Sequence, residues 1–330
     1  MDRQVATISK RNMRAERQRA EQIKRKRARR RRVRLIRALL RNTLILAFVL
    51  VIGALSWNFI QGTFFDTDDG KAKEGKNGDV SSQEQETNEV MQYSVGTPIV
   101  REANEIANRL KSLSQQYPEF LDIYENRNAY PQDLIASLCN NPEMIDFVKG
   151  YLNSDGSVTG GLTKKERSKD FPLLLQWDKR WGYASYGGSN IALAGCAPTC
   201  LSMVAIGLTR NEEITPDKVA DFAMNNGYYL EGTGTKWTLM TQGSSHFGIK
   251  AKELKLDRAS VMSELQNGHP IICSLRPGDF TTAGHFIVLV GIHDGKIRVN
   301  DPNCKERSNK LWDYDTLESQ IKNLWVFIKL

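Results

Sequence analysis

The distribution of apolar and polar residues divides the chain into segments of different character. Residues 1–42 are polar and basic, residues 43–65 are apolar without a single charge, and residues 66–96 are rich in Asp, Glu, Gly and Ser. Residues 97–152 show helical periodicity, and residues 165–330 mix helical and strand-like patterns. We therefore expect a tail, a transmembrane helix, a disordered linker, a small helical segment and one main domain.

In the helical segment, the apolar residues Ile106, Leu110, Leu113 and Tyr117 recur with the spacing of one helix face. Further on, three prolines precede apolar pairs, and proline suits the first turn of a helix. The segment is small for an independent core. We expect three or four short helices that pack on the main domain or on a partner.

The main domain combines helices in its first part with strands in its last. Helices are expected from the cap at Thr215 to residue 226, from residue 258 to 266, and after a capping-box pattern at residues 315–318. The expected strands are residues 271–275, 285–292, 296–299 and 324–329. Helices followed by antiparallel strands predict an α+β domain.

Charge adds a membrane topology to this picture. The tail has seventeen Lys and Arg against three acidic residues, a balance of +14, so residues 43–330 carry −6 of the chain's net +8. No aromatic residue is interleaved for base stacking, which argues against nucleic acid as a partner. The basic excess before the apolar run predicts a single-pass protein with a cytoplasmic N-terminus and residues 66–330 outside.

A cleaved signal peptide is the alternative for this N-terminal region. Residues 54–56, Ala-Leu-Ser, resemble a cleavage site, but the basic region is too long for a signal peptide and apolar residues continue past the site. We therefore expect an uncleaved anchor in the cell membrane.

The candidate nucleophile is Cys196, in the stretch Gly195-Cys196-Ala197-Pro198-Thr199. The following residues are almost all apolar or small, and Pro198 fits only the first turn of a helix. Cys196 is thus expected at a helix N-terminus, where the helix dipole favours a thiolate. Gly195 would allow a substrate to approach the backbone closely. The alternative is a small buried hydrophobe.

Four more cysteines bring the count to an odd five, which does not form a clean disulfide framework. Cys200 lies one turn after Cys196 and could pair with it or share a metal, but its apolar neighbours favour a packed core thiol. Cys273 is expected in the core as well. One bridge, between cysteines that the sequence does not identify, is possible for a domain outside the cytoplasm.

The candidate base is His285, which begins a strand that is apolar on both faces. A titratable side chain at the end of a central strand would be unusual if it served only to pack the core. Of the other three histidines, His293 lies in a turn, His269 precedes a proline and His246 lies in a polar loop. These three are expected to be structural.

The candidate group that orients this base is Asp301, with Asn300 as the alternative if the strand register differs. A two-residue turn at Asp294–Gly295 would place His285 and Asp301 on opposite faces of the hairpin. A three-residue loop with a left-handed Gly295 would place them on the same face. The catalytic hypothesis therefore predicts the three-residue loop.

Gln176 lies twenty residues before Cys196. Its side-chain amide and the backbone N–H of Cys196 would together make an oxyanion hole. The alternative is a surface glutamine in a loop.

Taken together, these stretches resemble a known pattern: Gln176 with Trp177 and Trp181, then Gly195–Thr199, Gly284–Val288 and Asn300–Pro302. Over about residues 170–330 they are similar to the papain-like bacterial cysteine peptidases of the double-glycine type, cysteine-peptidase family 39 and its relatives. The resemblance implies a papain-like fold in which a helix bearing the nucleophile packs on an antiparallel sheet. It also implies Cys196 as nucleophile, His285 as general base and acid, Asp301 as orienter and Gln176 in the oxyanion hole.

The chain departs from that pattern in several respects. Ala197 replaces the usual second glycine, and Gln176 lies further from the cysteine than in the enzymes that trim bacteriocin leaders. Those enzymes are also fused to a transporter in the cytoplasm, whereas we expect this domain to face outward without one. Cleavage of a double-glycine leader is therefore not implied. The anchored arrangement resembles surface proteins of Gram-positive bacteria.

We therefore expect a membrane-anchored, extracytoplasmic thiol peptidase that acts on peptides or proteins without a cofactor. The alternatives are an amidase of cell-wall peptides with the same triad, and a non-catalytic peptide-binding module. Loops 231–237, with Trp237, and 279–282 would line the groove beside Gly195 and Gly284. A metal site at the triad is not favoured, because no HExxH or paired CxxC motif is present. The oligomeric state stays open.

Overall fold

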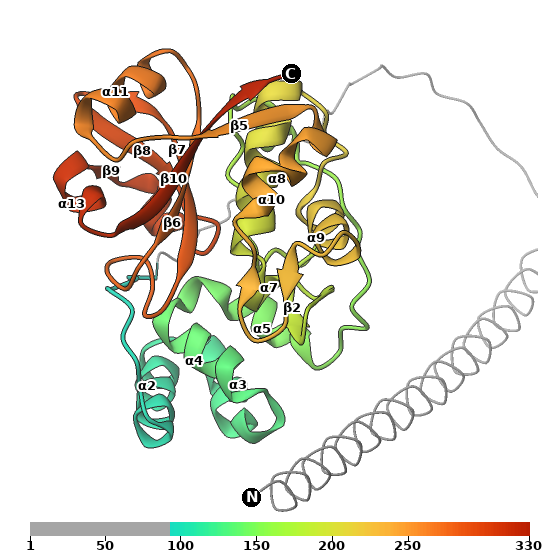
Figure 1. Ribbon diagram of the computed structural model, residues 1–330. Coiled ribbons are helices and arrows are strands. Elements are labelled where there is room, and N and C mark those ends of the chain that lie inside the picture. Colours follow the sequence, from blue (N-terminus) through green and yellow to red (C-terminus); the bar gives the residue numbers. More distant parts are fainter. Residues whose placement is uncertain (1–92) are drawn as a thin grey trace, which may run out of the picture. The chain divides into compact units, whose positions relative to one another are not determined.

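The computed structural model describes residues 93–330, which belong to one compact unit (Figure 1). The expected tail and transmembrane helix, and nearly all of the linker, lie outside the described residues. Among residues 93–330, no helix has the length and apolar character needed to cross a bilayer.

The N-terminal part of this unit consists of short helices. They are α2 (Ala103–Gln116), α3 (Leu121–Glu125), α4 (Gln132–Asn140) and α5 (Ile145–Tyr151), with 3-10 turns at Pro118–Phe120, Arg127–Ala129 and Pro142–Met144. The face of α2 that the periodicity predicts, with Ile106, Leu110 and Leu113, is buried.

The helical segment shares its core with the main domain. Its apolar side chains pack in one cluster with Leu175, Trp177 and Ala192, which precede the candidate nucleophile. The segment thus packs on the main domain, the first of the two alternatives expected from its small size. The term helical segment, used above for the expected residues 97–152, refers from here on to residues 93–151.

The main domain is built around a six-stranded antiparallel sheet with the order β5-β10-β6-β7-β8-β9. The strands are β5 (Ile249–Glu253), β6 (Ile271–Leu275), β7 (His285–His293), β8 (Lys296–Asn300), β9 (Leu311–Trp312) and β10 (Ile321–Lys329). Two small hairpins add β1 (Ser185–Tyr186) with β2 (Ser189–Asn190), and β3 (Tyr229–Leu230) with β4 (Gly234–Thr235).

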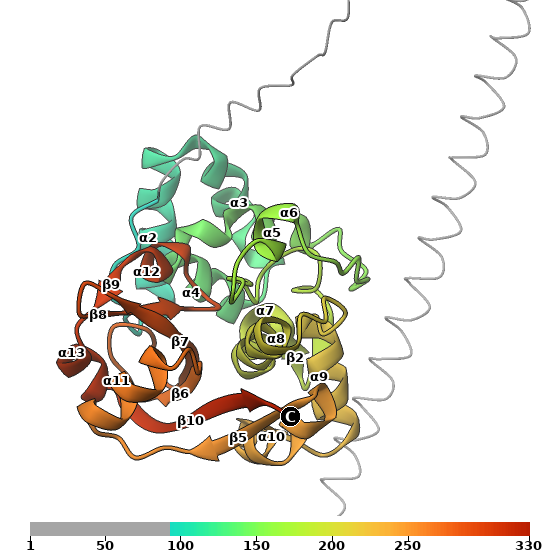
Figure 2. The same ribbon diagram turned by 90° about the horizontal axis from the view of Figure 1, so that it is seen from above.

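Helices cover both faces of the sheet (Figure 2). On one face lies α8 (Cys196–Thr209), with α9 (Pro216–Asn225) packed behind it. On the other face lie α11 (Arg258–Gln266) and α13 (Tyr314–Glu318). The remaining helices are α6 (Lys164–Arg167), α7 (Ile191–Ala194), α10 (Thr238–Thr241), α12 (Lys305–Asn309) and the 3-10 turn Gly243–Phe247.

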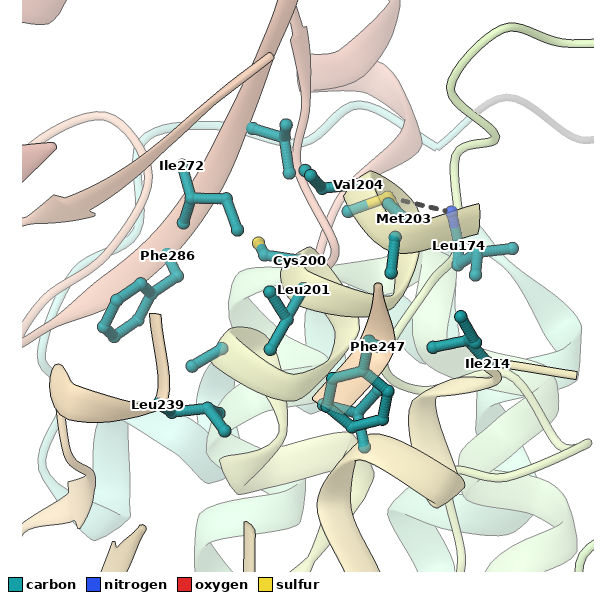
Figure 3. Close-up of a cluster of buried hydrophobic side chains, with 14 of the residues drawn as sticks. Leu174, Cys200, Leu201, Met203, Val204, Ile214, Leu239, Phe247, Ile272 and Phe286 are labelled. Atoms are coloured by element: carbon teal, nitrogen blue, oxygen red, sulfur yellow. Dashed lines mark hydrogen bonds between the residues drawn. The ribbon is translucent and has the colours of Figure 1, made fainter. Parts of the chain in front are cut away.

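The helix α8 is buried on nearly all sides, as its apolar sequence predicts. Figure 3 shows Cys200, Leu201 and Val204 of this helix among side chains from the sheet and from neighbouring helices. The backbone N–H of Leu174 also donates to Sδ of Met203, at 3.2 Å. This packing fixes the helix whose first residue is Cys196.

The sequence predicts this mixture of helices and antiparallel strands, but it misses most of the short elements, one longer strand and one helix start. Strand β5 is missed because its residues, Ile-Lys-Ala-Lys-Glu, are largely polar and pair only at the sheet edge. The capping-box assignment at residues 315–318 is wrong, because these residues lie inside α13, whose N-cap is Asp313.

Candidate catalytic site

A tight connection between two helices positions the thiol. Gly195 ends α7 and is the N-cap of α8, and Cys196 is half-buried at the first helical position. A Cβ at Gly195 would lie 2.6 Å from both the side chain and the carbonyl oxygen of Ile191. Close packing against Ile191 therefore requires a glycine at this position, whether or not a substrate also approaches it.

The candidate base and its orienter form a buried pair. Nε2 of His285 lies 2.7 Å from Oδ1 of Asp301, and the two side chains are 7% and 0% exposed. The thiol of Cys196 lies close enough to the His285 ring to raise its pKa. Because Asp301 occupies Nε2, the nitrogen left for the thiol is Nδ1.

The strand register that brings His285 and Asp301 together has a different origin from the one that we expected. The turn has two residues, Asp294 and Gly295, both with positive φ (49° and 72°), so His293 lies opposite Lys296. The three-residue loop that we expected is therefore wrong. A β-bulge in β7, between residues 289 and 291, then shifts the pairing by one residue.

Beyond the bulge, Val288 lies opposite Asn300, the register that the longer loop would have given. The one extra residue that the longer loop would have contributed is therefore present, but it lies in the bulge within β7 and not in the turn. Asn300 is not the orienting group, because its Nδ2 donates to the carbonyl oxygens of Phe171 and Pro172, each at 3.2 Å.

Asp301 has further partners besides the histidine. Its Oδ2 accepts from Nε of Arg307 at 2.6 Å, and its Oδ1 also accepts from the backbone N–H of Asn303 at 2.8 Å. Its own N–H donates to Oγ of Ser308 at 2.9 Å. The carboxylate is therefore held at both oxygens and at its backbone.

The charges around the pair favour its ionised form. Burial by itself lowers the pKa of His285, but the charge of Asp301 and the hydrogen bonds to Asp301 and Cys196 raise it to about 9. Burial alone would raise the pKa of Asp301, yet the cations His285 and Arg307 hold it below its ordinary value. The site therefore favours an imidazolium beside a carboxylate at neutral pH.

Gln176 is buried, contrary to the surface alternative, at 5% exposure. Its Nε2 donates one proton to the carbonyl oxygen of Ala192 at 2.6 Å, one helical turn before Cys196. An oxyanion-hole role requires the second Nε2 proton, since an amide NH₂ has two. The backbone N–H of Cys196 is the other candidate donor, because the first N–H groups of a helix have no acceptor within it.

Two hydrogen bonds join the glutamine loop to the loop that follows the aspartate. The backbone N–H of Gln176 donates to the carbonyl oxygen of Pro302 at 2.7 Å. Nε1 of Trp177 donates to the carbonyl oxygen of Asn303 at 2.8 Å. Together with the bond from Gln176 to Ala192, these bonds bring the expected site residues of three separate stretches into one region.

The residues expected to bind substrate differ in their surroundings. Trp237 is 39% exposed, and its ring packs edge-on against Trp325 at 5.5 Å. Gly284 directly precedes the histidine, and a Cβ there would meet only the carbonyl oxygen of Leu275, at 3.9 Å. Phe280, in the second expected substrate loop, is buried against Trp312 and does not line a groove. Substrate contact at Trp237, Gly195 and Gly284 stays a prediction.

The other cysteines lie apart from this chemistry. All five are free thiols, and every one except Cys196 is buried. Burial raises the pKa of Cys200 and Cys273, of Cys139 to about 11 and of Cys304 to about 12. Cys200 is therefore a packed thiol, as its apolar neighbours suggest. Within residues 93–330, no cluster of His, Cys, Asp and Glu is arranged to hold a metal ion.

Sequence reasoning missed Arg307, the second partner of the aspartate. It lies in the polar run Lys305-Glu306-Arg307, which has the composition of a solvated surface, yet its side chain is 4% exposed. Nothing in its local pattern indicates burial.

Comparison with known proteins supports the resemblance at the level of the domain. Residues 168–329 match the model of the Peptidase_C39 like family, just under half of the chain. This match supports a C39-like peptidase domain over these residues. No curated protein matches the sequence.

Solved structures similar to the chain share little sequence with it. The peptidase domain of Streptococcus ComA, a bi-functional ABC transporter involved in quorum sensing, is 15% identical with a TM-score of 0.33, and 42% of this chain covers 93% of that one. A double-glycine motif protease from an AMS/PCAT transporter, in complex with the leader peptide, is 14% identical with a TM-score of 0.31. The match covers 50% of this chain and 94% of that one. A C39-like peptidase from Bacillus anthracis is 15% identical with a TM-score of 0.28, and the match covers 42% of this chain and 90% of that one.

Proposed function

We propose that this domain is a cysteine peptidase in which Cys196 is the nucleophile, His285 the general base and acid, and Asp301 the group that orients the base. One observation carries the proposal. A buried imidazole is bonded through Nε2 to a buried carboxylate at 2.7 Å, and the thiol at the start of α8 is close enough to raise the pKa of that imidazole. A nucleophile, a base and an orienting group gathered at one place are the parts of a thiol hydrolase.

The geometry supports acylation of the thiol. The Sγ of Cys196, as thiolate, attacks the carbonyl carbon of a peptide bond, and the carbonyl oxygen becomes an oxyanion. The backbone N–H of Cys196 and Nε2 of Gln176 stabilise that oxyanion. The imidazolium of His285 then gives its Nδ1 proton to the leaving amine, so that the C–N bond breaks and a thioester remains.

In deacylation the same groups act, but His285 now accepts a proton where it donated one before. Neutral His285 takes a proton from a water molecule, whose oxygen attacks the thioester carbonyl. The C–S bond breaks, the product leaves as a carboxylic acid that gives its proton to the solvent, and the thiolate–imidazolium pair is restored. Asp301 keeps Nε2 of the ring engaged in both steps, so Nδ1 stays directed at the reacting atoms.

We place this domain outside the cytoplasm on a single transmembrane helix. The support comes from the sequence, because seventeen basic residues precede an uncharged apolar run at residues 43–65. The substrates would then be extracytoplasmic peptides or proteins.

The catalytic proposal is tested by alkylation of the full-length chain with a limiting amount of iodoacetamide across pH, followed by peptide mass spectrometry. We expect Cys196 to react quickly below pH 7, and H285A to abolish this. H269A is the matched control, since Nδ1 of His269 also bonds a carboxylate, Oε2 of Glu264, at 2.7 Å. Reaction of Cys196 no faster than that of Cys139 or Cys304 would contradict the proposal.

Peptidase activity itself is tested with a peptide library that includes cell-wall peptides. Fragments that the wild type releases and C196A does not would establish hydrolysis. Cleavage confined to cell-wall peptides would favour the amidase alternative. A reactive Cys196 without any cleavage would favour the binding module.

The topology is tested by labelling whole cells with a membrane-impermeant maleimide. Ser157 is exposed, so S157C provides a reporter on the domain, and S9C provides one in the tail. We expect S157C to react on intact cells and S9C only after permeabilisation. The reverse pattern would place the domain in the cytoplasm.

A further inference from the structure

The carboxylate that orients the base depends on an arginine outside the triad. Oδ1 of Asp301 faces His285, and Oδ2 accepts from Nε of Arg307 at 2.6 Å. Both partners of this ion pair are buried, with side chains 0% and 4% exposed. The rotation of the carboxylate is therefore set by the arginine as much as by the histidine.

Burial of this arginine is not explained by packing. A buried ion pair gains little over well-packed apolar side chains, because desolvation offsets the attraction. Nη1 of Arg307 is buried and has no hydrogen-bond partner among the described residues, which adds to that cost. A leucine or methionine would fill the space at lower cost, so the guanidinium points to a role at Asp301.

The helix that carries this arginine is held from outside the main domain. Helix α12 has only five residues, which is too short to be stable alone. The carboxylate of Glu143 accepts from the backbone N–H groups of Lys305 and Glu306, at 2.7 and 2.9 Å. Glu143 belongs to the helical segment, so this segment caps α12.

Two more bonds join the helical segment to the same stretch. Nδ2 of Asn141 donates to the carbonyl oxygen of Asn303, and the N–H of Val95 donates to Oε2 of Glu306 at 2.5 Å. Asn303 and Glu306 lie on either side of the Cys304 cap of α12. The segment thus contacts the region between Asp301 and Arg307 at three places.

We infer that Arg307 is a positioning residue for Asp301, and that Glu143 of the helical segment acts through α12 to keep it in place. The segment is then a working part of the peptidase site and not only a stalk. This inference rests on the proposed function, because it concerns the same triad.

Titratable and charged groups from several elements interact with the triad. Cys200 of α8 and Tyr186 of β1 interact with Cys196, and Cys304 and Arg307 interact with Asp301. Glu143 of the helical segment interacts in turn with Cys304 and Arg307. A change that keeps the cation at position 307 therefore separates geometry from charge.

The test uses the full-length chain and two readouts, Cys196 alkylation at pH 6 and the titration of His285 followed by its ¹³Cε1 resonance. R307K keeps the charge but not the Nε–H donor that bonds Oδ2. We expect it to slow alkylation at least tenfold and to lower the titration midpoint of His285, because Asp301 no longer fixes the imidazolium. E143A should act in the same direction, several-fold, and E143Q should fall between E143A and wild type.

Glu102 provides the matched control in the same segment. It caps α2 with a capping box and is exposed. E102A should cost some stability but leave both readouts unchanged in the folded protein, which circular dichroism monitors. If R307K does not fold, the two readouts in E143Q test the inference instead. The amide of this variant keeps one acceptor oxygen for the N–H groups of α12, so the variant should fold.

Each result has a distinct meaning. Folded R307K and E143A with the wild-type rate and midpoint would overturn the inference and leave the peptidase proposal standing. Equal effects of E143A and E102A would overturn it as well, because they would show a general loss of stability. A wild-type chain without fast alkylation of Cys196 would overturn the proposed function, and this inference with it.

Discussion

His285 and Asp301 lie 2.7 Å apart, although the turn that joins their strands would by itself leave them one residue out of register. The bulge in β7 supplies the missing residue. Bulges near functional sites redirect a side chain without changing the turn. Here the result is a histidine and a carboxylate in contact at the end of a buried strand.

We expect the ring of His285 to titrate with a midpoint near pH 9, well above an ordinary histidine. Burial alone would lower this pKa, and the negative charge of Asp301 reverses the effect. D301N removes that charge and should bring the midpoint below 6.5. NMR of ¹³C-labelled histidine measures it, and H285Q assigns the signal among the four histidines. An unchanged midpoint in D301N would contradict this account.

The same shift predicts how stability depends on pH. The folded-state pKa of His285 is raised to about 9, so its contribution is complete below about pH 6.5 and is lost as the pH rises through 9. We expect the free energy of unfolding to fall by about 3 kcal/mol over that interval on account of this residue. Denaturation by urea at several pH values measures it. H285Q should remove most of this slope.

Gln176 should affect turnover without affecting the nucleophile. Loss of one oxyanion donor typically costs about 100- to 1000-fold in kcat. Q176A should therefore lower kcat on a cleaved peptide by that order and leave the alkylation rate of Cys196 at pH 6 unchanged. Equal losses in both measurements would show that Gln176 supports the fold through its bond to Ala192 instead.

Gly207 of α8 should resist replacement although it lies in a helix. Alanine gains about 1 kcal/mol in helix propensity over glycine. A Cβ at this position would lie 2.2 Å from the ring of Phe171 and 2.7 Å from the carbonyl oxygen of Asp170, and overpacking costs about 1–3 kcal/mol. Because a backbone atom cannot easily move, we expect G207A to be destabilised overall. The midpoint of urea denaturation decides the sign.

The centre of the sheet follows from the sequence because β6 and the first part of β7 are buried on both faces. Strand β6 spans residues 271–275 as predicted, and helix α11 spans residues 258–266 as predicted. Strand β5 could not be found in this way, because an edge strand with polar residues has no apolar pattern.

The candidate site shows a similar limit. Cys196, His285 and Asp301 each carry a local signal, namely a helix start, a strand start and a hairpin partner. Arg307 has none: the helix that carries it is bonded to Glu143, whose carboxylate accepts from the N–H of Glu306, 163 positions later in the chain. Contacts of that range arise only from tertiary packing.

The shared core of the helical segment and the main domain bears on how this protein is produced for study. The family match begins at residue 168, after the helical segment. A fragment cut there would turn Leu175, Trp177 and Ala192, now at most 8% exposed, towards water. Contiguous apolar surface of this kind promotes aggregation. Expression should therefore begin before Val95, so that the soluble product retains the partners of these side chains.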